Sequence, residues 1–252
     1  MQIMKLLAGC LIVGTGLILS ALPAASQTAS KTLDEKAVRD IVIKTIREQP
    51  EIVLNALRQL EARAQKAKAK EALTANASDI FNHKDDPVGG NPKGDITLVE
   101  FFDYQCGFCK RVHPAITQLL KEDGNIRYVH KEFPILGEAS ILASRAALAA
   151  KRLGSYHKFS NALMESRGAL NAERIFSIAK SSGLDVEKLK AEIENGAESG
   201  NTIIRRNYKL AKALSINGTP AFIVGDQVIR GAPEHDTLKA IIAKARKAKS
   251  TK

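Results

Sequence analysis

The sequence predicts an α/β fold preceded by a helical arm, and three observations lead to this prediction. First, a short β-branched and aromatic run, "ITLVEFF" (residues 96–102), is followed by an amphipathic stretch and by a second alternating run, "NIRYVHKEFP". Second, several amphipathic segments follow one another from about residue 138 to 214. Third, two short apolar runs surround Gly225 and precede a last amphipathic segment. Strand, helix, strand, helical insert, hairpin and helix make one α/β domain over residues 81–252.

The first 26 residues have the composition of a Sec-type signal peptide. Lys5 precedes a long apolar stretch, Leu6 to Leu22, and "PAAS" supplies small residues before a cleavage point near residue 26. Ser20 interrupts the stretch, which disfavours a transmembrane anchor. Too few apolar residues precede Cys10 for "LAGC" to be a lipobox. We therefore expect an exported, periplasmic protein from which this segment has been removed.

Composition limits the partners of the mature chain. Lys and Arg total 38 against 27 Asp and Glu, and this positive charge is spread along the sequence. It predicts a solvated cationic surface that is attracted to an anionic envelope, and no nucleic-acid partner. Without the signal peptide, Cys106 and Cys109 are the only cysteines, and export places them in an oxidising compartment.

Residues 27–80 are expected to form a helical arm of two helices, at about 33–48 and 50–74, with Pro50 in the first turn of the second. A heptad seam of apolar residues runs along the second helix: Val53, Leu57, Leu60, Ala64 and Ala67. The segment "NHKDDPVGGNPKGD" (residues 82–95) then predicts a loop that separates the arm from the domain. The seam either packs on the chain's own body or joins copies of the chain, and we expect a homo-oligomer.

Start and stop signals delimit the helices of the domain. The helix after the first strand begins at about Cys106 and ends at Gly124. In the second strand Ile126 and Tyr128 share a face, and His130 is a further candidate for it. Gly225-Asp226 predicts the turn of a hairpin. In the insert, the predicted N-caps are Asn171 and Asp185. The predicted helix ends there are Gly154, Gly183 and Gly196.

The pair Cys106 and Cys109 admits several interpretations. A structural zinc site usually needs four ligands, but the histidines are scattered without ligand spacing, so we expect no metal and no cofactor. Residue 110 is lysine, which does not fit haem attachment. A structural disulfide across two residues would close a very small loop and stabilise the fold weakly. A redox-active pair is the interpretation that remains.

The predicted local structure suits this chemistry. Cys106 lies where a helix begins, and unpaired N–H groups and the helix dipole there favour a thiolate. We expect Cys106 to be an exposed nucleophile and Cys109, one turn into the helix, to be the buried resolving thiol. Lys110 and Arg111 either add positive charge near the thiols or are solvated. Glu100 lies in an otherwise apolar strand, where a carboxyl is costly unless it is used, so we expect it to accept the proton of Cys109.

Three stretches, "EFFDYQCGFC", "KEFPILG" and "GTPAF" (residues 218–222), together resemble the DsbA-type branch of the thioredoxin superfamily over about residues 80–247. The resemblance implies a thioredoxin fold with a helical insert at about 138–214. It also implies thiol–disulfide exchange and a cis-proline at Pro220. That proline would turn the Thr219 backbone toward Cys106 and offer an edge to an extended substrate.

Two features differ from the oxidases of this branch. They carry Pro-His between the cysteines, whereas this chain has Gly107-Phe108, which implies a weaker oxidant. Thr219 and the arm instead resemble the oligomeric disulfide isomerases and the suppressor-of-copper-sensitivity proteins. We expect an exported oxidoreductase that forms or isomerises disulfides in unfolded or misoxidised exported proteins and is reset by a membrane redox partner. The alternative is an envelope-associated structural or copper-handling protein whose thiols bind rather than exchange.

Overall fold

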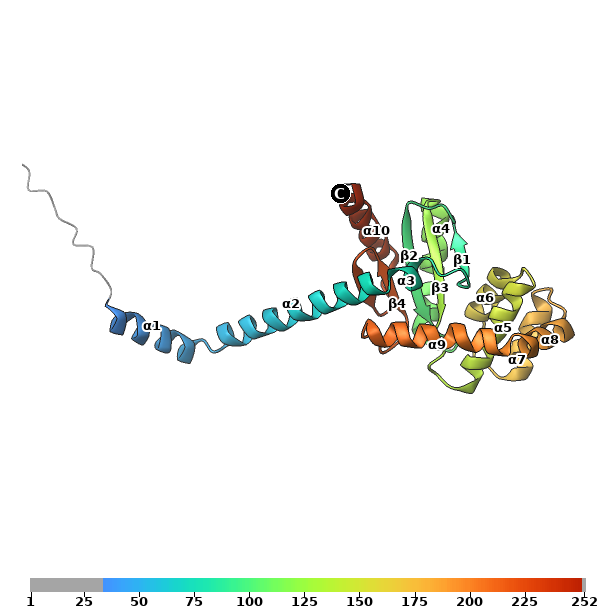
Figure 1. The fold of residues 1–252 in the computed structure, drawn as a ribbon, viewed down its shortest axis with the longest axis horizontal. Helices are drawn as coiled ribbons and strands as arrows, with labels where there is room; N and C mark the ends of the chain where they lie inside the picture. The colour runs from blue at the N-terminus through green and yellow to red at the C-terminus, as the bar shows by residue number, and fades with distance from the viewer. Residues whose placement is uncertain (1–33, 251–252) are drawn as a thin grey trace, which may run out of the picture. The chain divides into compact units, whose positions relative to one another are not determined.

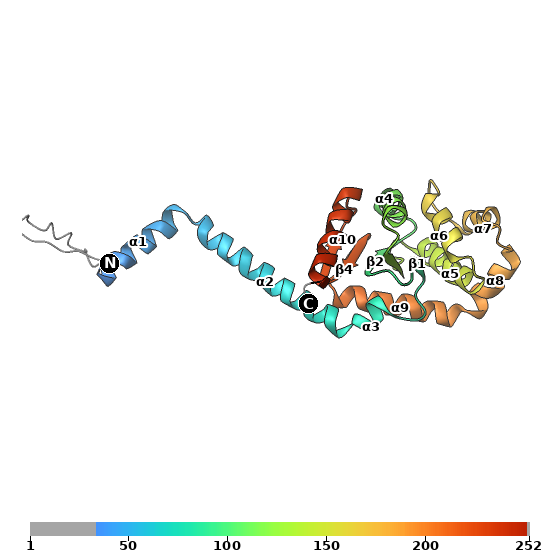
Figure 2. The same cartoon turned by 90° about the horizontal axis from the view of Figure 1, so that it is seen from above.

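The computed structural model describes residues 34–250, and Figures 1 and 2 show its elements in two views. The predicted signal peptide lies outside the described residues. Within the described part of the chain, no helix combines the length and the apolar character that crossing a membrane requires. Contacts divide the chain into two compact units, with the division between Ala56 and Leu57.

The two helices predicted for the arm are present. Helix α1 spans Glu35–Glu48, and the side chain of Asp34 caps it by accepting the N–H of Ala37 at 2.7 Å. Helix α2 spans Glu51–Ala75 and follows Pro50 directly. The carbonyl of Pro50 accepts the N–H of Leu54 at 3.2 Å, so this proline begins the hydrogen bonding of the helix without needing an N–H of its own.

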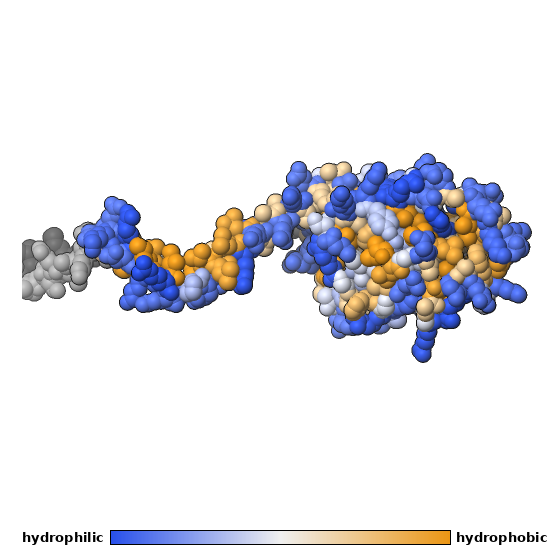
Figure 3. All heavy atoms as spheres, turned by 90° about the horizontal axis from the view of Figure 1, so that it is seen from below, coloured by the Kyte–Doolittle hydropathy of each residue, from blue (hydrophilic) through white to orange (hydrophobic). Residues whose placement is uncertain are grey.

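Large apolar side chains of the arm are exposed. In the predicted seam Val53, Leu57 and Leu60 are 40%, 54% and 65% exposed. Helix α1 buries no residue, although it is rich in valine and isoleucine. Figure 3 shows apolar surface along the arm. The predicted seam lies on α2 alone, but α1 carries comparable exposed apolar residues.

A five-stranded mixed sheet organises the second unit, and its strands are β1 (Val88–Gly90), β2 (Ile96–Phe102), β3 (Ile126–Glu132), β4 (Ala221–Val224) and β5 (Gln227–Arg230). The strand order is β1-β3-β2-β4-β5, with β2 and β3 parallel and every other pairing antiparallel. Strands β2 and β3 pair along their whole length, from Ile96 with Ile126 to Phe102 with Glu132. The predicted strand–helix–strand unit and hairpin are confirmed.

Helices cover both faces of the sheet (Figures 1 and 2). Helices α4 (Gly107–Asp123) and α10 (His235–Ser250) share a core with Leu98 and Phe222 on one face. Helix α9 (Ala197–Ala213) and the short α3 (Ala77–Phe81) pack with residues of the other face, such as Phe101. The alternation of the central strands therefore builds two apolar cores, which is the layered arrangement of an α/β domain.

The helical insert forms a third core beside the sheet from α5 (Glu138–Arg152), α6 (Tyr156–Glu165), α7 (Ala172–Ser181) and α8 (Val186–Asn195). Alanines of α5 lie at its centre, because small side chains let the other helices approach closely. The predicted caps are confirmed: Asn171 and Asp185 accept the N–H groups of Arg174 and Lys188 at 2.8 and 3.1 Å.

The predicted helix ends in the insert follow two patterns. Gly154 and Gly183 have φ of 72° and 83°, in the left-handed region where helices commonly end. Gly196 has φ of −98° and leads directly from α8 into α9. Its helix-end role is therefore confirmed without the left-handed backbone that favours glycine.

Residues 82–95 are more ordered than the predicted loop. Strand β1 lies within them and pairs antiparallel with β3, Val88 opposite Val129. Two of its three residues are glycines, and apolar and polar residues do not alternate in it. The sequence of β1 therefore does not indicate a strand. The glycines fit because the backbones approach closely: a Cβ at Gly90 would lie 2.4 Å from the carbonyl oxygen of Ile126, and one at Gly94 would lie 2.4 Å from that of Asn125.

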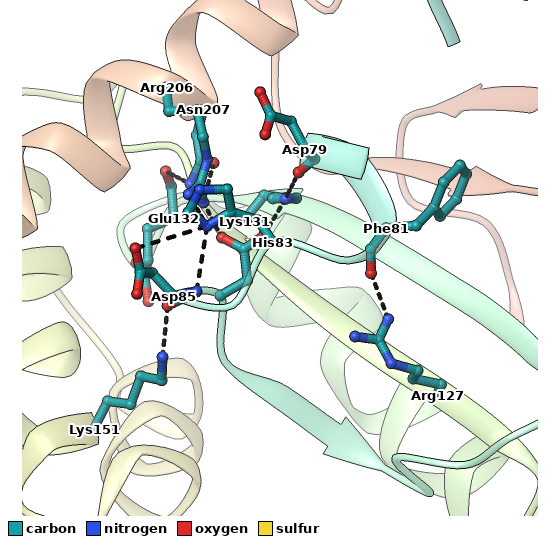
Figure 4. Close-up of polar contacts among 11 residues, drawn as sticks. Asp79, Phe81, His83, Asp85, Arg127, Lys131, Glu132, Lys151, Arg206 and Asn207 are labelled. Atoms are coloured by element: carbon teal, nitrogen blue, oxygen red, sulfur yellow. Dashed lines mark hydrogen bonds and ion pairs between the residues drawn. The ribbon is translucent and has the colours of Figure 1, made fainter. Parts of the chain in front are cut away.

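A buried polar cluster ties residues 79–86 to the sheet and to α9 (Figure 4). The Nζ of Lys131 donates to the Asp79 carbonyl at 2.5 Å and to the Asp86 carboxylate. Arg206 of α9 also donates to Asp86 and contacts His83. The side chains of Lys131 and Asp86 are 0% and 1% exposed, so these charges compensate one another away from solvent.

Asp86→Ala should destabilise the fold by roughly 3–5 kcal/mol, because it leaves the buried Lys131 and the partly buried Arg206 without their shared counter-charge. Chemical denaturation of the variant measures this loss. Glu194→Ala, at an exposed position of α8, is the control and should change the free energy of unfolding by less than about 0.5 kcal/mol. Equal stability of the two variants would contradict a structural role for the cluster.

Candidate active site around Cys106 and Cys109

The turn between β2 and α4 positions Cys106. Strand β2 ends at Phe102, and Cys106 is the N-cap residue of α4 with extended backbone angles. Asp103 organises the turn, because its carbonyl accepts the N–H of Cys106 at 3.1 Å and its Oδ1 accepts the N–H of Gln105 at 2.7 Å. The cysteine therefore stands at the beginning of a helix, as the sequence predicts.

Asp103 also holds the neighbouring loop, a role that was not predicted from the sequence. Its Oδ2 accepts the N–H groups of Ile135 and Leu136 at 2.8 and 2.9 Å, and the hydroxyl of Ser140 donates to Oδ1 at 2.7 Å. Asp103 is fully buried. An aspartate between a buried strand and a helix was the available signal, but its partners lie more than 30 residues away in the sequence.

Cys106 has the properties of a thiolate. The hydrogen bond from the Cys109 thiol is the main cause that lowers the pKa of Cys106 to about 5, and the side chain of Thr219 and the N–H groups of Cys109 and Phe108 act in the same direction. Its Sγ lies 3.2 Å from the Thr219 carbonyl oxygen. Cys106 is only 6% exposed, so the expectation of an exposed nucleophile is wrong. The Thr219 backbone lies against the sulfur and limits its access to solvent.

Cys109 is the opposite kind of thiol. It is 1% exposed on the inner side of α4. Burial raises its pKa above the ordinary value, and the hydrogen bond to Cys106 and the charge of Glu100 add to this effect. Both cysteines are in the free thiol form. The site thus holds one thiol that ionises easily and one that keeps its proton.

Glu100 lies in β2 and is 2% exposed. Burial raises the pKa of Glu100 to about 8, although the hydrogen bond from the Tyr128 hydroxyl opposes that shift. Its charge influences both cysteines, because the ionised carboxylate raises the pKa of Cys109 and ionised Cys106 raises that of Glu100. A carboxyl with these properties can exchange a proton near neutral pH.

The Thr219–Pro220 peptide bond is cis, as the resemblance implies. Pro220 directly precedes β4 and is buried, and its carbonyl accepts the N–H of Gly231 at 3.0 Å. The fold therefore brings together the five residues singled out from the sequence: Cys106, Cys109, Glu100, Thr219 and Pro220. Their chemical roles stay predictions.

The two basic residues after Cys109 have different surroundings. Lys110 donates from Nζ to the carbonyls of Leu163 and Ser166 at 2.9 and 2.7 Å, so it satisfies the end of α6. The Arg111 guanidinium lies 4.6 Å from the centre of the Phe108 ring, and Phe108 is 55% exposed. Lys110 is thus anchored to the insert, and Arg111 packs on the aromatic side chain between the cysteines.

A second buried carboxyl near the site was not predicted. Glu132, at the end of β3, is fully buried, and burial raises the pKa of Glu132 to about 7. The hydroxyls of Tyr104 and Tyr156 donate to its Oε1 at 2.8 and 2.7 Å. The alternation of Tyr128, His130 and Glu132 in β3 was the available signal, since alternate residues of a strand share a face.

Among residues 34–250, His, Cys, Asp and Glu side chains form no group of three or more that is arranged to hold a metal ion.

Comparisons with known proteins agree with this fold. A family model described as thioredoxin matches residues 82–244. A thioredoxin-like oxidoreductase from Silicibacter pomeroyi is 42% identical, with a TM-score of 0.66, and the match covers 68% of this chain and 98% of that one. The thiol-disulfide exchange protein alpha-DsbA2 from Wolbachia pipientis is 31% identical, with a TM-score of 0.68 and coverage of 72% and 97%.

Proteus mirabilis ScsC, in a structure described as a transitional conformation, is 26% identical with a TM-score of 0.65. That match covers 85% of this chain and 97% of ScsC, so it extends beyond the region of the family model.

Curated relatives include the Na(+)/H(+) antiporter NhaA 1 of Salinispora arenicola, 26% identical over 187 residues. This match covers 72% of the chain and only 28% of the antiporter. The thioredoxin model and the solved structures instead account for the fold of most of the chain. The chain therefore belongs to the thioredoxin family, and its layout is that of the DsbA-like and ScsC-like thiol–disulfide oxidoreductases.

Proposed function

We propose that this protein is a periplasmic thiol–disulfide oxidoreductase that forms or isomerises disulfide bonds in exported proteins. The unequal thiol pair is the observation that carries the proposal. Cys106, with a pKa of about 5, is ionised at neutral pH, while burial keeps Cys109 protonated. The signal-peptide composition of the first 26 residues supports export to an oxidising compartment.

The proposed reaction begins when the Cys106 thiolate attacks a client disulfide, forms a mixed disulfide and releases one client thiolate. Cys109 then gives its proton to ionised Glu100 and attacks the Cys106 sulfur. This step forms the Cys106–Cys109 disulfide and releases the second client thiolate. In the opposite direction a client thiolate attacks Cys106, and the leaving Cys109 takes the proton of Glu100, so the same groups serve oxidation.

The Thr219 backbone offers a place for the client. Its carbonyl lies 3.2 Å from the Cys106 sulfur, next to the cis Thr219–Pro220 bond. An extended client segment that pairs with this backbone would hold its own sulfur beside Cys106. The ring of Phe108, two residues after Cys106, is exposed and adds apolar surface that a client can contact.

The arm supports self-association of the protein. Its exposed apolar residues on α1 and α2 are unusual for a soluble surface and are typical of an interface. The match to ScsC extends beyond the catalytic region. Linked copies would present several thiol pairs to one misoxidised client, which favours isomerisation, because a client released by one site remains near another. A membrane redox partner would then reset the pair.

Cys106→Ala should abolish disulfide exchange, because the remaining Cys109 thiol is buried and keeps its proton. Cys109→Ala should retain attack and accumulate mixed disulfides with clients, which non-reducing electrophoresis detects. Alkylation of Cys106 in the reduced wild-type protein should follow a titration with a midpoint at about pH 5. Equal partial activity of the two variants would contradict the assignment of roles.

Glu100→Gln should slow resolution of the mixed disulfide and also stabilise the protein. The raised pKa means that the folded chain keeps this proton up to about pH 8, whereas the unfolded chain releases it at about 4.5. The favourable contribution of protonated Glu100 is therefore complete below about pH 4.5 and is lost as pH rises to about 8. The stability gain of the variant should grow over that range to the order of a few kcal/mol.

Denaturant titrations at several pH values measure this gain, and rapid quenching of the reaction with a disulfide measures resolution. Glu165→Gln is a matched control, since Glu165 is an exposed carboxylate at the end of α6. A pH-independent difference in stability between wild type and Glu100→Gln would show that Glu100 does not titrate in this range.

Substitution of Leu57 and Leu60 by glutamate should dissociate the oligomer without unfolding the catalytic body, because both side chains are exposed in the protomer. Light scattering should show a lower mass, and isomerisation of a scrambled client should fall while dithiol oxidation persists. The double substitution Arg58→Gln and Arg63→Gln lowers the net charge by the same amount elsewhere on α2 and is the control. A wild-type chain that is already monomeric would contradict self-association.

A further inference from the structure

Titratable side chains form a row under helices α4 and α6. Tyr128, His130 and Glu132 alternate along one face of β3, and Glu100 of β2 pairs in register with His130. All four are at most 7% exposed. The ring centres of Tyr128 and His130 are 4.2 Å apart. Burying apolar side chains at these positions would cost less free energy than burying polar ones, so the row calls for a functional explanation.

A cavity of about 470 Å³ adjoins this row. It lies between α4, α6 and the edge strand β1, and Tyr128 and His130 are part of its lining. His157 and Asn161, which also line it, are exposed residues of α6, so the cavity communicates with solvent. Since one water takes about 30 Å³ in the liquid, there is room for several molecules beside polar side chains.

The proposed reaction requires a path for protons to this depth. Cys109 and Glu100 are 1% and 2% exposed, so neither exchanges protons readily with bulk solvent by direct contact. Each turnover moves a proton between them, and Glu100 must then release or regain it. The Tyr128 hydroxyl donates to Oε2 of Glu100, and Tyr128 also lines the cavity. It is the side chain that joins the carboxyl to the cavity.

We propose that Tyr128 relays protons between Glu100 and solvent in the cavity bounded by β1, α4 and α6. This inference rests on the proposed function and adds the route by which protons pass between Glu100 and solvent. As Glu100 loses its proton to the phenol oxygen, Tyr128 passes its own proton to water in the cavity. Tyr128 stays neutral, and the net change is one proton transferred from the Cys109 thiol to solvent. Oxidation of a client uses the same transfers in reverse.

The groups around the relay fit this direction of transfer. The charge of Glu100 in β2 interacts with those of Cys106 and Cys109, which lie at the start of α4. Glu132 of β3 also raises the pKa of Glu100. Burial, with smaller effects of His157 and His113, keeps the pKa of His130 well below its usual value, so its ring is neutral beside Tyr128. The Nε2 of His130 is buried and has no hydrogen-bond partner. It lies 3.2 Å from where a Cβ on Gly89 would be, and Gly89 also lines the cavity.

The test compares Tyr128→Phe with Tyr156→Phe in the full mature chain. Both variants lose one buried hydroxyl that donates to a buried carboxyl, but Tyr156 serves Glu132 rather than Glu100. The reduced protein is mixed with oxidised glutathione and quenched with acid at intervals. Mass spectrometry then separates formation of the Cys106–glutathione mixed disulfide from its resolution by Cys109. The series is repeated over pH and with added imidazole as a small proton carrier.

Tyr128→Phe should slow resolution by roughly tenfold or more, with unchanged formation of the mixed disulfide. Imidazole should restore part of the rate and saturate, which a purely structural defect would not allow. Tyr156→Phe should resolve at the wild-type rate. A wild-type rate and pH profile in Tyr128→Phe would overturn the relay. Absence of the mixed disulfide in the wild-type protein would instead overturn the proposed function.

Asn161→Phe provides a second test that leaves Tyr128 and Glu100 intact. Asn161 is exposed and lines the cavity, so an added ring there reduces the space for water with little risk to folding. Resolution should be slower than in the wild type at low buffer concentration. A wild-type rate in this variant would overturn the cavity as the route, even if Tyr128→Phe is slow.

Discussion

The chemistry of this protein depends on where one sulfur atom lies. Cys106 occupies the first position before α4, where a neighbouring thiol and the N–H groups of the first turn point at its Sγ. These donors stabilise a negative charge that the buried surroundings would otherwise oppose, so they favour the reduced, ionised form of the pair. Cys109, three residues later, lies on the inner side of the same helix. One helix start therefore makes two identical residues chemically different.

The rest of the fold holds that helix start in place. Asp103 fixes the turn before Cys106 and the loop at residues 135–136 with the same carboxylate. The cis Thr219–Pro220 segment closes the opposite side. Beneath the helix, Glu100 and Tyr128 replace apolar residues that would pack more cheaply, and the buried polar groups are hydrogen-bonded or neutral. The acid–base groups at this face of the sheet therefore lower the stability of the fold. The cluster around Lys131 anchors the opposite face.

Local patterns predicted most of the fold, because strands, helix caps and the hairpin leave short-range signals. The cysteine pair and Glu100 were predicted for the same reason: the pair follows the end of β2 at a helix start, and Glu100 is the carboxyl within that apolar strand. What the sequence did not reveal depends on distant partners. Strand β1 has only "VGG" and exists because β3 has an open edge. The hydrogen bond of Tyr128 to Glu100 and the low exposure of Cys106 also arise from tertiary packing.

The reduction potential of the Cys106–Cys109 pair, measured by equilibration with glutathione, tests the central claim most directly. Nucleophilic cysteines have a pKa of about 7 in thioredoxin and about 3.5 in DsbA, and their pairs have potentials of about −270 and about −120 mV. A pKa of about 5 for Cys106 lies between these values. The account therefore predicts an intermediate potential, since stabilising the thiolate makes the disulfide more oxidising. A potential at or below that of thioredoxin would contradict it.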